Sequence, residues 1–556
     1  MTITKMLIIV SSIGALVWAA ISLFSSVTGQ VGVEIPPTLA VLSDLPKAEK
    51  LCGIKSNKWR VKREIDGVLV SASTRCIPDN PWEVAAFVKG TNNVSMQTLM
   101  STRLASDAVI KENDRDGDGD PDVIHIRLEV AELNGSSPDG ELFLPTYEIA
   151  PGVTPGLWVF APKTRGMAAI NLYSYAAIPE LRAPSPVIRV EQGDSVMITL
   201  ENTHYFPHTI HLHGVDHPYL DAQGRGNDGV PLTAEHPVMP GETRTYSLKP
   251  RQTGTMFYHC HVQTDKHLMM GLQGMFVVEE NRPNNWLQTM NIGAGLVRHS
   301  SVAVKESFDL EYDLHYQNID KELNSSIQSA NDPRLIAKQM NRVYDMTDAT
   351  ADYFLLNGHS FPFTLRDSLI VADPDQHIKL RIVNGQSEVL ALHTHGHKAT
   401  ITHYDGIEIP QAAQITRDVV MLGPAQRADL NLSTTDDGLH SYGPGVWLFH
   451  NHAEKGITTD GRGPGGDISL IVYRSFLEAD GMPKLQGVDI ARFIEPEYYA
   501  GDRSVWGRSS AAQLLGEAAL VQPGLIWLIA FGVVVGLILG LLLWLLAGNK
   551  ALGADR

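Results

Sequence analysis

Val187-Ile188-Arg189-Val190, followed by Gly193-Asp194-Ser195-Val196-Met197-Ile198-Thr199-Leu200, carries the clearest structural pattern in the chain. Short runs rich in β-branched residues around a glycine turn predict two strands. A related phrase, Asp375-Gln376-His377-Ile378-Lys379-Leu380-Arg381-Ile382-Val383-Asn384, recurs roughly 180 residues later. Each phrase precedes a cluster of histidines. The repetition predicts two homologous β domains, and short strands with Gly and Pro turns are typical of sandwiches.

Length and composition agree with a multidomain β protein. The chain has 556 residues, and single domains rarely exceed about 250 residues. It contains 48 glycines and 31 prolines, as expected for many turns, while 44% hydrophobic and 19% charged residues indicate a folded protein. The net charge of −17 argues against nucleic acid as a partner and favours a cationic or neutral one.

The sequence on both sides of the repeat predicts the organisation of the chain. Met6 to Phe24 is apolar and follows Lys5, and Gly524 to Gly548 is apolar and precedes Lys550. Runs of this length span membranes, and basic flanking residues stay in the cytoplasm. We therefore expect the chain to be anchored in the inner membrane, with the β domains on the periplasmic side. The predicted segments are a signal anchor or signal peptide (1–29), an N-terminal extension (30–149), β domain 1 (150–295), β domain 2 (296–475), a linker (476–522) and a transmembrane helix (523–549).

The three cysteines have two different roles. Export makes a disulfide between Cys52 and Cys76 the expected state, with free thiols as the alternative. Cys260 stands alone inside a histidine cluster, so its role must differ.

Four histidine clusters carry the chemistry. They are His208-Thr209-Ile210-His211-Leu212-His213, Phe257-Tyr258-His259-Cys260-His261 with the nearby His267, His393-Thr394-His395, and His450-Asn451-His452. In a strand, residues two apart share a face, so each His-x-His pair presents two imidazoles side by side. Cys260 then points to the face opposite His259 and His261, which makes this strand a covalent bridge between two metal sites.

The ligand types indicate copper. A thiolate with two imidazoles is the blue-copper arrangement, and His208, Cys260 and His267 can supply it. Eight neutral imidazoles with no carboxylate are too many for one ion and predict a cluster of about three copper ions. These eight are His211, His213, His259, His261, His393, His395, His450 and His452.

The four phrases resemble the copper motifs of the multicopper oxidases, over residues of about 150 to 475, and the two-domain, small-laccase-like type is the most similar. The resemblance implies an all-β fold: two cupredoxin-like Greek-key β-sandwich domains, here with an N-terminal extension and terminal transmembrane helices. It implies type 1 ligands His208, Cys260 and His267, and type 2 ligands His211 and His393. The implied type 3 ligands are His213, His259, His261, His395, His450 and His452.

The sequence departs from the family pattern in two places. Leu390 stands three residues before His393, where a second type 1 site would need a histidine, so the blue copper is expected in domain 1 only. His267 lies seven residues after Cys260, two more than the family's usual spacing. Counting on to the axial position gives Leu272, which we expect there; Met270 is the alternative.

The resemblance also implies the activity. A donor gives single electrons to the type 1 copper, they pass through Cys260 to His259 and His261, and the cluster reduces dioxygen to water, with about four coppers per chain. Asp228 resembles an acidic position that could deliver protons to the cluster, and Asp216 is a second candidate for this role. For each of them, the alternative is a surface carboxylate with no role in the reaction. The donor could be a cytochrome, a metal ion or a phenol.

Two other functions use similar parts: a copper nitrite reductase, and a non-enzymatic copper or electron-transfer protein. The histidine directly after Cys260 favours the oxidase. In the two-domain family, domain 1 of one subunit meets domain 2 of the next, which implies a homotrimer.

A second metal motif is unrelated to copper. The run from Asp114 to Asp122 has acids at every second position with turn glycines, which suits calcium bound by Asp114, Asp116 and Asp118. An EF-hand-type loop would end in Glu, but that position is His125. A solvated acidic turn is the alternative.

Overall fold

The computed structural model describes the part of the chain that holds the repeat. The described residues are 63–65, 68–70, 105, 107–118, 120–136, 147–164, 181–282, 285, 287, 289–291, 295–297, 308–494, 534–535 and 537–539. All of them except Ala479–Gly481 belong to one compact unit. The predicted segment 1–29, the pair Cys52 and Cys76, and most of 495–549 lie outside the described residues.

The first sandwich consists of two five-stranded sheets. One sheet contains β3 (Val109–Glu112), β4 (Val123–Leu133), β5 (Leu157–Pro162), β7 (Ser195–Glu201) and β9 (Thr243–Leu248). The other contains β6 (Val187–Glu191), β8 (His211–His213), β10 (Gly254–His259), β11 (Gln273–Glu279) and β12 (Met290–Asn291). Apolar side chains from both sheets form one core around Ile126, Ile198, Tyr258 and Phe276.

The first β domain begins earlier than the predicted boundary at residue 150. β4 lies wholly within 30–149, yet it pairs in parallel with β7 and antiparallel with β5. Its alternating side chains Ile124, Ile126 and Leu128 are buried in the first core. Because these strands complete a sheet, the segment from β3 onward is part of the sandwich and not an extension. A separate hairpin, β1 (Arg63–Ile65) with β2 (Val68–Val70), precedes it.

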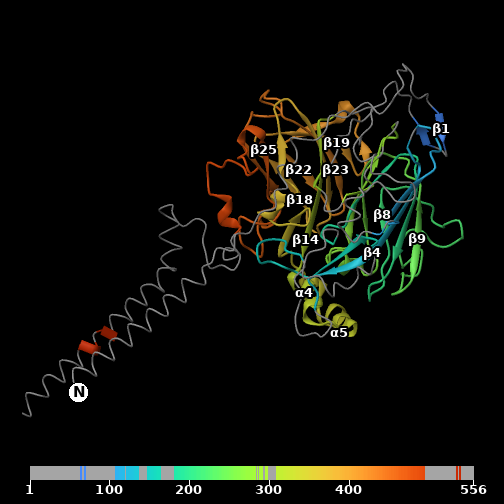
Figure 1. The fold of residues 1–556 in the computed structure, drawn as a ribbon, viewed down its shortest axis with the longest axis horizontal. Helices are drawn as coiled ribbons and strands as arrows, with labels where there is room; N and C mark the ends of the chain where they lie inside the picture. The colour runs from blue at the N-terminus through green and yellow to red at the C-terminus, as the bar shows by residue number, and fades with distance from the viewer. Residues whose placement is uncertain are drawn as a thin grey trace, which may run out of the picture. The chain divides into compact units, whose positions relative to one another are not determined.

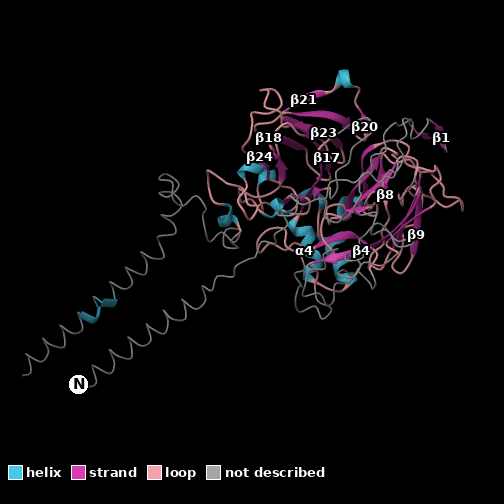
Figure 2. Ribbon diagram, turned by 45° about the horizontal axis from the view of Figure 1, so that its top comes forward, coloured by secondary structure: helices cyan, strands magenta, loops and turns pink. Residues whose placement is uncertain are grey.

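The second sandwich has an eight-stranded and a five-stranded sheet. The larger holds β13 (Gly295–Leu296), β14 (Leu310–Ile319), β15 (Tyr353–Leu356), β17 (His377–Asn384), β19 (Ala399–Tyr404), β20 (Ile407–Glu408), β21 (Ile415–Arg417) and β23 (Arg427–Ser433). The smaller holds β16 (Ile370–Ala372), β18 (Leu390–Thr394), β22 (Val419–Leu422), β24 (Val446–Asn451) and β25 (Ser469–Tyr473). Figures 1 and 2 show the strands of both sandwiches.

The two sandwiches repeat the same unusual pairing. β4 and β7 run parallel in the first, as β14 and β17 do in the second. β6 and β11 run parallel in the first, as β16 and β25 do in the second. β7 and β17 are the two related phrases of the sequence, so the predicted duplication is confirmed. β6 and β7, although separated by one turn, lie in different sheets.

Short helices occur between strands. At the start of the predicted domain 2, they are α4 (Lys321–Ser329), α5 (Pro333–Lys338), a π-helix (Gln339–Val343) and a 3₁₀ turn (Met346–Asp348). Asp320 caps α4 by accepting hydrogen bonds from the backbone N–H groups of Glu322 and Leu323. Leu323 and Ile327 join the core of the first sandwich, so this insertion from domain 2 covers domain 1.

The remaining helical turns are short. They are α3 (Thr264–His267) and the 3₁₀ turns Phe363–Arg366, Gln411–Ala413, Glu454–Ile457, Arg474–Phe476 and Ile490–Phe493.

Buried ion pairs join the sandwiches within the chain. Arg189 of β6 donates to both carboxylate oxygens of Asp313 on β14, at 2.7 Å each, and to Glu279 of β11 at 3.0 Å. Arg381 of β17 donates to Glu279 at 3.2 Å and to Asp429 of β23 at 2.9 Å. Removing one partner would leave a buried charge unpaired, which is strongly destabilising. The network therefore holds the two domains in one arrangement.

The predicted linker 476–522 is partly folded. Ile490 and Phe493 are buried, and the rings of Phe493 and Phe361 lie 5.5 Å apart, so the chain stays packed on domain 2 as far as residue 494. Within the predicted transmembrane segment only residues 534–535 and 537–539 are described, and they are helical. Among the described residues, no helix has the length and hydropathy that a membrane span requires.

Candidate metal centres

Two neighbouring strands of the first sandwich align the histidines of domain 1. β8 pairs antiparallel with β10, with His211 opposite His259 and His213 opposite Phe257. Side chains on one face of such a pair lie about 5 Å apart, which brings imidazoles from both strands together. Cys260 follows directly and projects to the other side, as the strand alternation predicts.

Cys260 meets His208 and His267 in a buried thiol centre. Its Sγ lies 3.6 Å from Nδ1 of His208 and 3.4 Å from Nδ1 of His267. Donor atoms bound to one small metal ion with bonds of about 2.0–2.3 Å lie about 3 to 4 Å apart, so the spacing fits a single ion. All three residues are buried. A soft thiolate with two imidazoles is a donor set that suits copper.

The loop after Cys260, although longer than usual, still places His267 beside the thiol. Gln263 has a left-handed φ of 44°, and α3 follows it and ends at His267. This single turn absorbs the two extra residues and points His267 back at the thiol. Met270 and Leu272 are both buried in the same core as Cys260, so the expected axial position of Leu272 stays a prediction.

A further histidine, His204, lies beside this centre and escaped the sequence analysis. Its Nδ1 is 2.9 Å from Nε2 of His208, and it is buried against the ring of Trp158. With Nδ1 of His208 directed at the thiol, Nε2 of His208 carries the proton and donates to His204. Trp158 also contacts His208 and His267 edge to face. Only the spacing of four residues between His204 and His208 could have indicated this role.

The four remaining histidines of domain 1 form one compact group. Nε2 of His213 and Nε2 of His259 are 3.0 Å apart, close enough to share one ion. The ring of His211 lies 5.1 Å from the rings of both His213 and His261. Potential ligand atoms of His211, His213 and His259 all lie within 4.8 Å of one another.

Domain 2 contains a matching group. β18 pairs with β24, which sets His393 opposite His450. Nε2 of His395 and Nε2 of His450 are 3.2 Å apart. The ring of His393 lies 4.6 Å from that of His395 and 5.5 Å from that of His452.

The two groups make equivalent hydrogen bonds to the backbone of their own domains. Nδ1 of His211 donates to the carbonyl of Asp228 at 2.7 Å, and Nδ1 of His393 donates to that of Asp418 at 3.0 Å. Nδ1 of His259 and of His450 each donate to the carbonyl of the next residue. These bonds fix the tautomer and leave the Nε2 lone pairs free for metal.

Burial keeps these groups in a state that suits copper. It lowers the pKa of His267 and of His259 to about 3, and that of His213, which also feels His211 and Arg427, to about 4. Neutral imidazoles are the form that binds metal. Burial raises the pKa of the Cys260 thiol to about 11, so a bound cation is needed to hold it as the thiolate.

The two histidine groups are separate within one chain. Among the described residues, no ring contact or hydrogen bond joins any of the four histidines of domain 1 to any of the four of domain 2. The clusters able to hold a metal there take their histidines from domain 1 alone.

The structure separates the two acidic candidates. Oδ1 of Asp228 lies 3.0 Å from Nε2 of His217 and 3.4 Å from Nδ1 of His211, beside a predicted type 2 ligand. Asp216 instead pairs with the exposed Arg251 at 2.9 Å. Asp228 therefore remains as the proton-delivery candidate. His217 is its direct partner.

The acidic loop is likewise brought together. Carboxylate oxygens of Asp114, Asp116 and Asp122 lie within 4.8 Å of one another. The backbone N–H of Asp118 donates to Asp114 at 3.0 Å and to Asp116 at 3.1 Å. Asp122 was not among the predicted ligands.

Comparison with known proteins assigns both domains to one family. Residues 177–283 and residues 336–460 each match a sequence model described as "Multicopper oxidase". The chain is 33% identical over 135 residues to oxidoreductase OpS5 of Beauveria bassiana, covering 24% of this chain and 22% of that protein. It is 33% identical over 103 residues to the iron transport multicopper oxidase FET3 of Candida glabrata, covering 18% and 15%.

These curated relatives are matched over less than a quarter of their length. Among solved structures, multicopper oxidase mgLAC is 22% identical with a TM-score of 0.47, covering 67% of this chain and 92% of that one. Two family-model matches and one thiol centre flanked by paired histidines lead to a single conclusion: both sandwiches of this chain contain multicopper oxidase domains.

Proposed function

We propose that this chain oxidises a donor in one-electron steps and reduces dioxygen to water, using one type 1, one type 2 and two type 3 coppers. The observation that carries the proposal is the strand that ends in His259-Cys260-His261. The Cys260 thiol faces His208 and His267 on one side, while the flanking imidazoles face the His211 group on the other. Copper ions held at these positions supply the electron transfer and the oxygen reduction.

The protein's own residues would prepare both sites. Trp158 and the core around Met270 keep water from the thiol, because these side chains are buried. The covalent link from Cys260 to its two neighbours joins the sites without a gap. Asp228, partly exposed and bonded to His217, could hold a proton beside His211.

Half a cluster in each domain supports a homotrimer. If domain 1 of one subunit faces domain 2 of the next, the two groups of four histidines combine into one set of eight at every interface. A head-to-tail contact of this kind must close into a ring to avoid a filament. Three chains would then hold three interfacial clusters.

Mixed assemblies test this arrangement. One chain carries His211→Ala with His213→Ala, and the other carries His450→Ala with His452→Ala; each alone should be inactive. Random 1:1 trimers should recover about a quarter of the oxygen uptake, because that share of interfaces pairs two intact halves. No recovery in verified mixed trimers would place the cluster within one chain.

Oxygen uptake with ferrous iron, phenols and a basic cytochrome tests the activity and the donor class. The acidic surface favours the cationic donors. A 4:1 ratio of donor oxidised to oxygen consumed, without peroxide, is the expected result. Nitrite reduction without oxygen uptake would support the nitrite-reductase alternative, and neither activity would support an electron-transfer protein.

We also propose attachment to the inner membrane through residues 523–549, with both sandwiches on the periplasmic side. The apolar run from Gly524 to Gly548 and the basic residues after it support this topology. Ending the chain at residue 522 should release the protein from the membrane fraction if residues 1–29 are cleaved. The calcium expected at the acidic loop has no part in the oxygen chemistry.

A further inference from the structure

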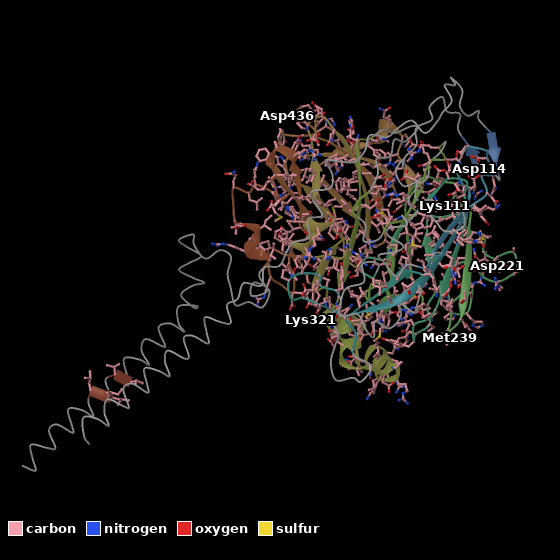
Figure 3. All side chains as sticks on the ribbon, in the orientation of Figure 1. Lys111, Asp114, Asp221, Met239, Lys321 and Asp436 are labelled. Carbon is pink, nitrogen blue, oxygen red and sulfur yellow. The ribbon has the colours of Figure 1, made fainter. Side chains whose placement is uncertain are left out.

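The acidic loop between β3 and β4 is buried, which does not fit a solvated turn. Asp116, Asp118, Asp120 and Asp122 are 1% to 4% exposed. Figure 3 labels Asp114 and Lys111 at this end of the hairpin. Buried carboxylates in folded proteins are paired with cations or coordinate metals.

Three residues from other parts of the chain bring more oxygen atoms to the loop. They are Glu191 at the end of β6, Asp194 in the next turn, and Asn285 after β11. The backbone N–H of Asn285 donates to Asp120 at 2.8 Å, and its side-chain amide donates to Oε1 of Glu191. Oε2 of Glu191, Oδ1 of Asp194 and Oδ1 of Asn285 are buried and have no hydrogen-bond partner among the residues that the structure describes. Such orphaned acceptors indicate a missing ion or water.

The charges in the cluster do not balance. Six buried carboxylates gather there: Asp116, Asp118, Asp120, Asp122, Glu191 and Asp194. Lys111, whose Nζ donates to the carbonyl of Leu287 at 3.1 Å, and Arg282 oppose them. A divalent cation would stabilise the ionised forms.

We propose that this cluster binds calcium, with Glu191 supplying the carboxylate that the loop itself lacks at its twelfth position. The donors are all carboxylate or amide oxygens, which suits a hard cation, and several come from different segments, which suits the large coordination shell of calcium better than the strict octahedron of magnesium. Neither imidazole nor thiol is among them, so copper is excluded by donor type. This site is independent of the proposed oxidase activity.

Its place in the chain indicates what calcium would do. Asn281 donates to Asp116 at 3.0 Å, and the backbone N–H of Arg282 donates to Glu191 at 3.1 Å. These residues lie between β11 and β12, the last two strands of the first sandwich before the chain enters the second. Glu191 shares β6 with Arg189, which holds the interdomain ion pairs. Calcium would therefore hold the β11–β12 connection against β6, next to the interdomain ion pairs of Arg189.

The test measures calcium binding and melting, not oxygen uptake. Copper-loaded full-length protein is prepared in calcium-depleted buffer without chelators, and its copper content is verified. Calcium chloride is then titrated by calorimetry and in thermal melts, with magnesium chloride in parallel. At a hundredfold excess over Kd, calcium should raise Tm by about 5 °C, and magnesium by much less. No calcium effect, or an equal effect of magnesium, would overturn the proposal.

Two isosteric variants separate a metal site from a merely hydrogen-bonded cluster. Glu191→Gln and Asp118→Asn should each weaken calcium binding at least tenfold. Without calcium, both should melt at or above the wild-type temperature, because each removes a repelling charge. Glu322→Gln, an exposed carboxylate on α4, is the matched control and should change neither value. Equal destabilisation of both variants with and without calcium would contradict the assignment.

Discussion

Cys260 in domain 1 and Asn451 in domain 2 stand at the same position of two equivalent strands, each between two histidines. Around Cys260 lie His208, His267 and an apolar wall. Around Asn451 lies a hydrogen-bond network: its Oδ1 accepts from the backbone N–H groups of Ala391 and Ala453 at 3.0 Å each.

The network in domain 2 extends inward. The backbone N–H of Asn451 donates to the buried Asp467 at 3.3 Å, and Gln386 donates to the same carboxyl at 3.0 Å. Leu390, buried, stands where the other domain has His208. The duplicated strands thus place the outward imidazoles in both domains alike. A few inward residues determine whether the other side of the strand presents a thiol with two imidazoles or a hydrogen-bond network.

The largest expected effect is at Cys260. Cys260→Ser should abolish the visible thiolate band and reduce oxygen uptake at least about 100-fold, because a hydroxyl is not the soft ligand the site requires. Visible spectra and metal analysis check it, and the cluster copper should remain. Asn451→Ser is the control and should keep the band. A band that survives Cys260→Ser would refute the assignment of the thiol.

Asn451→Ala should act on stability instead of colour. It leaves the partly buried N–H groups of Ala391 and Ala453 without their acceptor, at a cost of about 1 kcal/mol or less for each. Denaturant unfolding monitored by tryptophan fluorescence measures the loss. An unchanged free energy of unfolding would show that water replaces the amide and that the network contributes little.

Asp467→Asn should change the pH dependence of stability. Burial raises the pKa of Asp467 to about 7, well above the unfolded value near 4. The folded state therefore holds a proton that the unfolded state releases, so this group lowers stability as pH rises from about 4 to 7. The variant should melt above wild type at pH 8, and the difference should shrink as the pH falls toward about 4. A constant difference across this range would contradict the raised pKa.

The smallest expected effect is that of a double variant in domain 2, which should not create a second thiolate–copper centre. Leu390→His with Asn451→Cys restores one imidazole and the thiol in domain 2. No second blue band should appear, because residues 453 to 470 contain no histidine to match His267. A copper titration followed at the thiolate band tests this, with the Leu390→His single variant as control. A new band would mean that the strands of domain 2, with one imidazole and one thiol, are sufficient to form the thiolate–copper centre.

The grouping of the proposed copper ligands within each domain could be predicted from the sequence because strand alternation is local. His-x-His places two imidazoles on one face wherever the backbone is extended, and the Cys260 face follows from the same rule. The recurrence of β7 as β17 likewise needed no contact information. The assembly of the two halves and the axial ligand remain predictions.

The sequence did not predict the roles of residues that depend on distant partners. β4 looked like part of an extension, since only its pairing with β7 shows that it completes a sheet. The strand β14 carries the buried Asp313, and no local pattern shows that Arg189 of the other domain is its partner. Glu191 lies beside the acidic loop, and His204 is hydrogen-bonded to His208. Both contacts result from chain folding that no local sequence pattern encodes. Local periodicity sets which way a side chain points, whereas long-range packing sets what it meets.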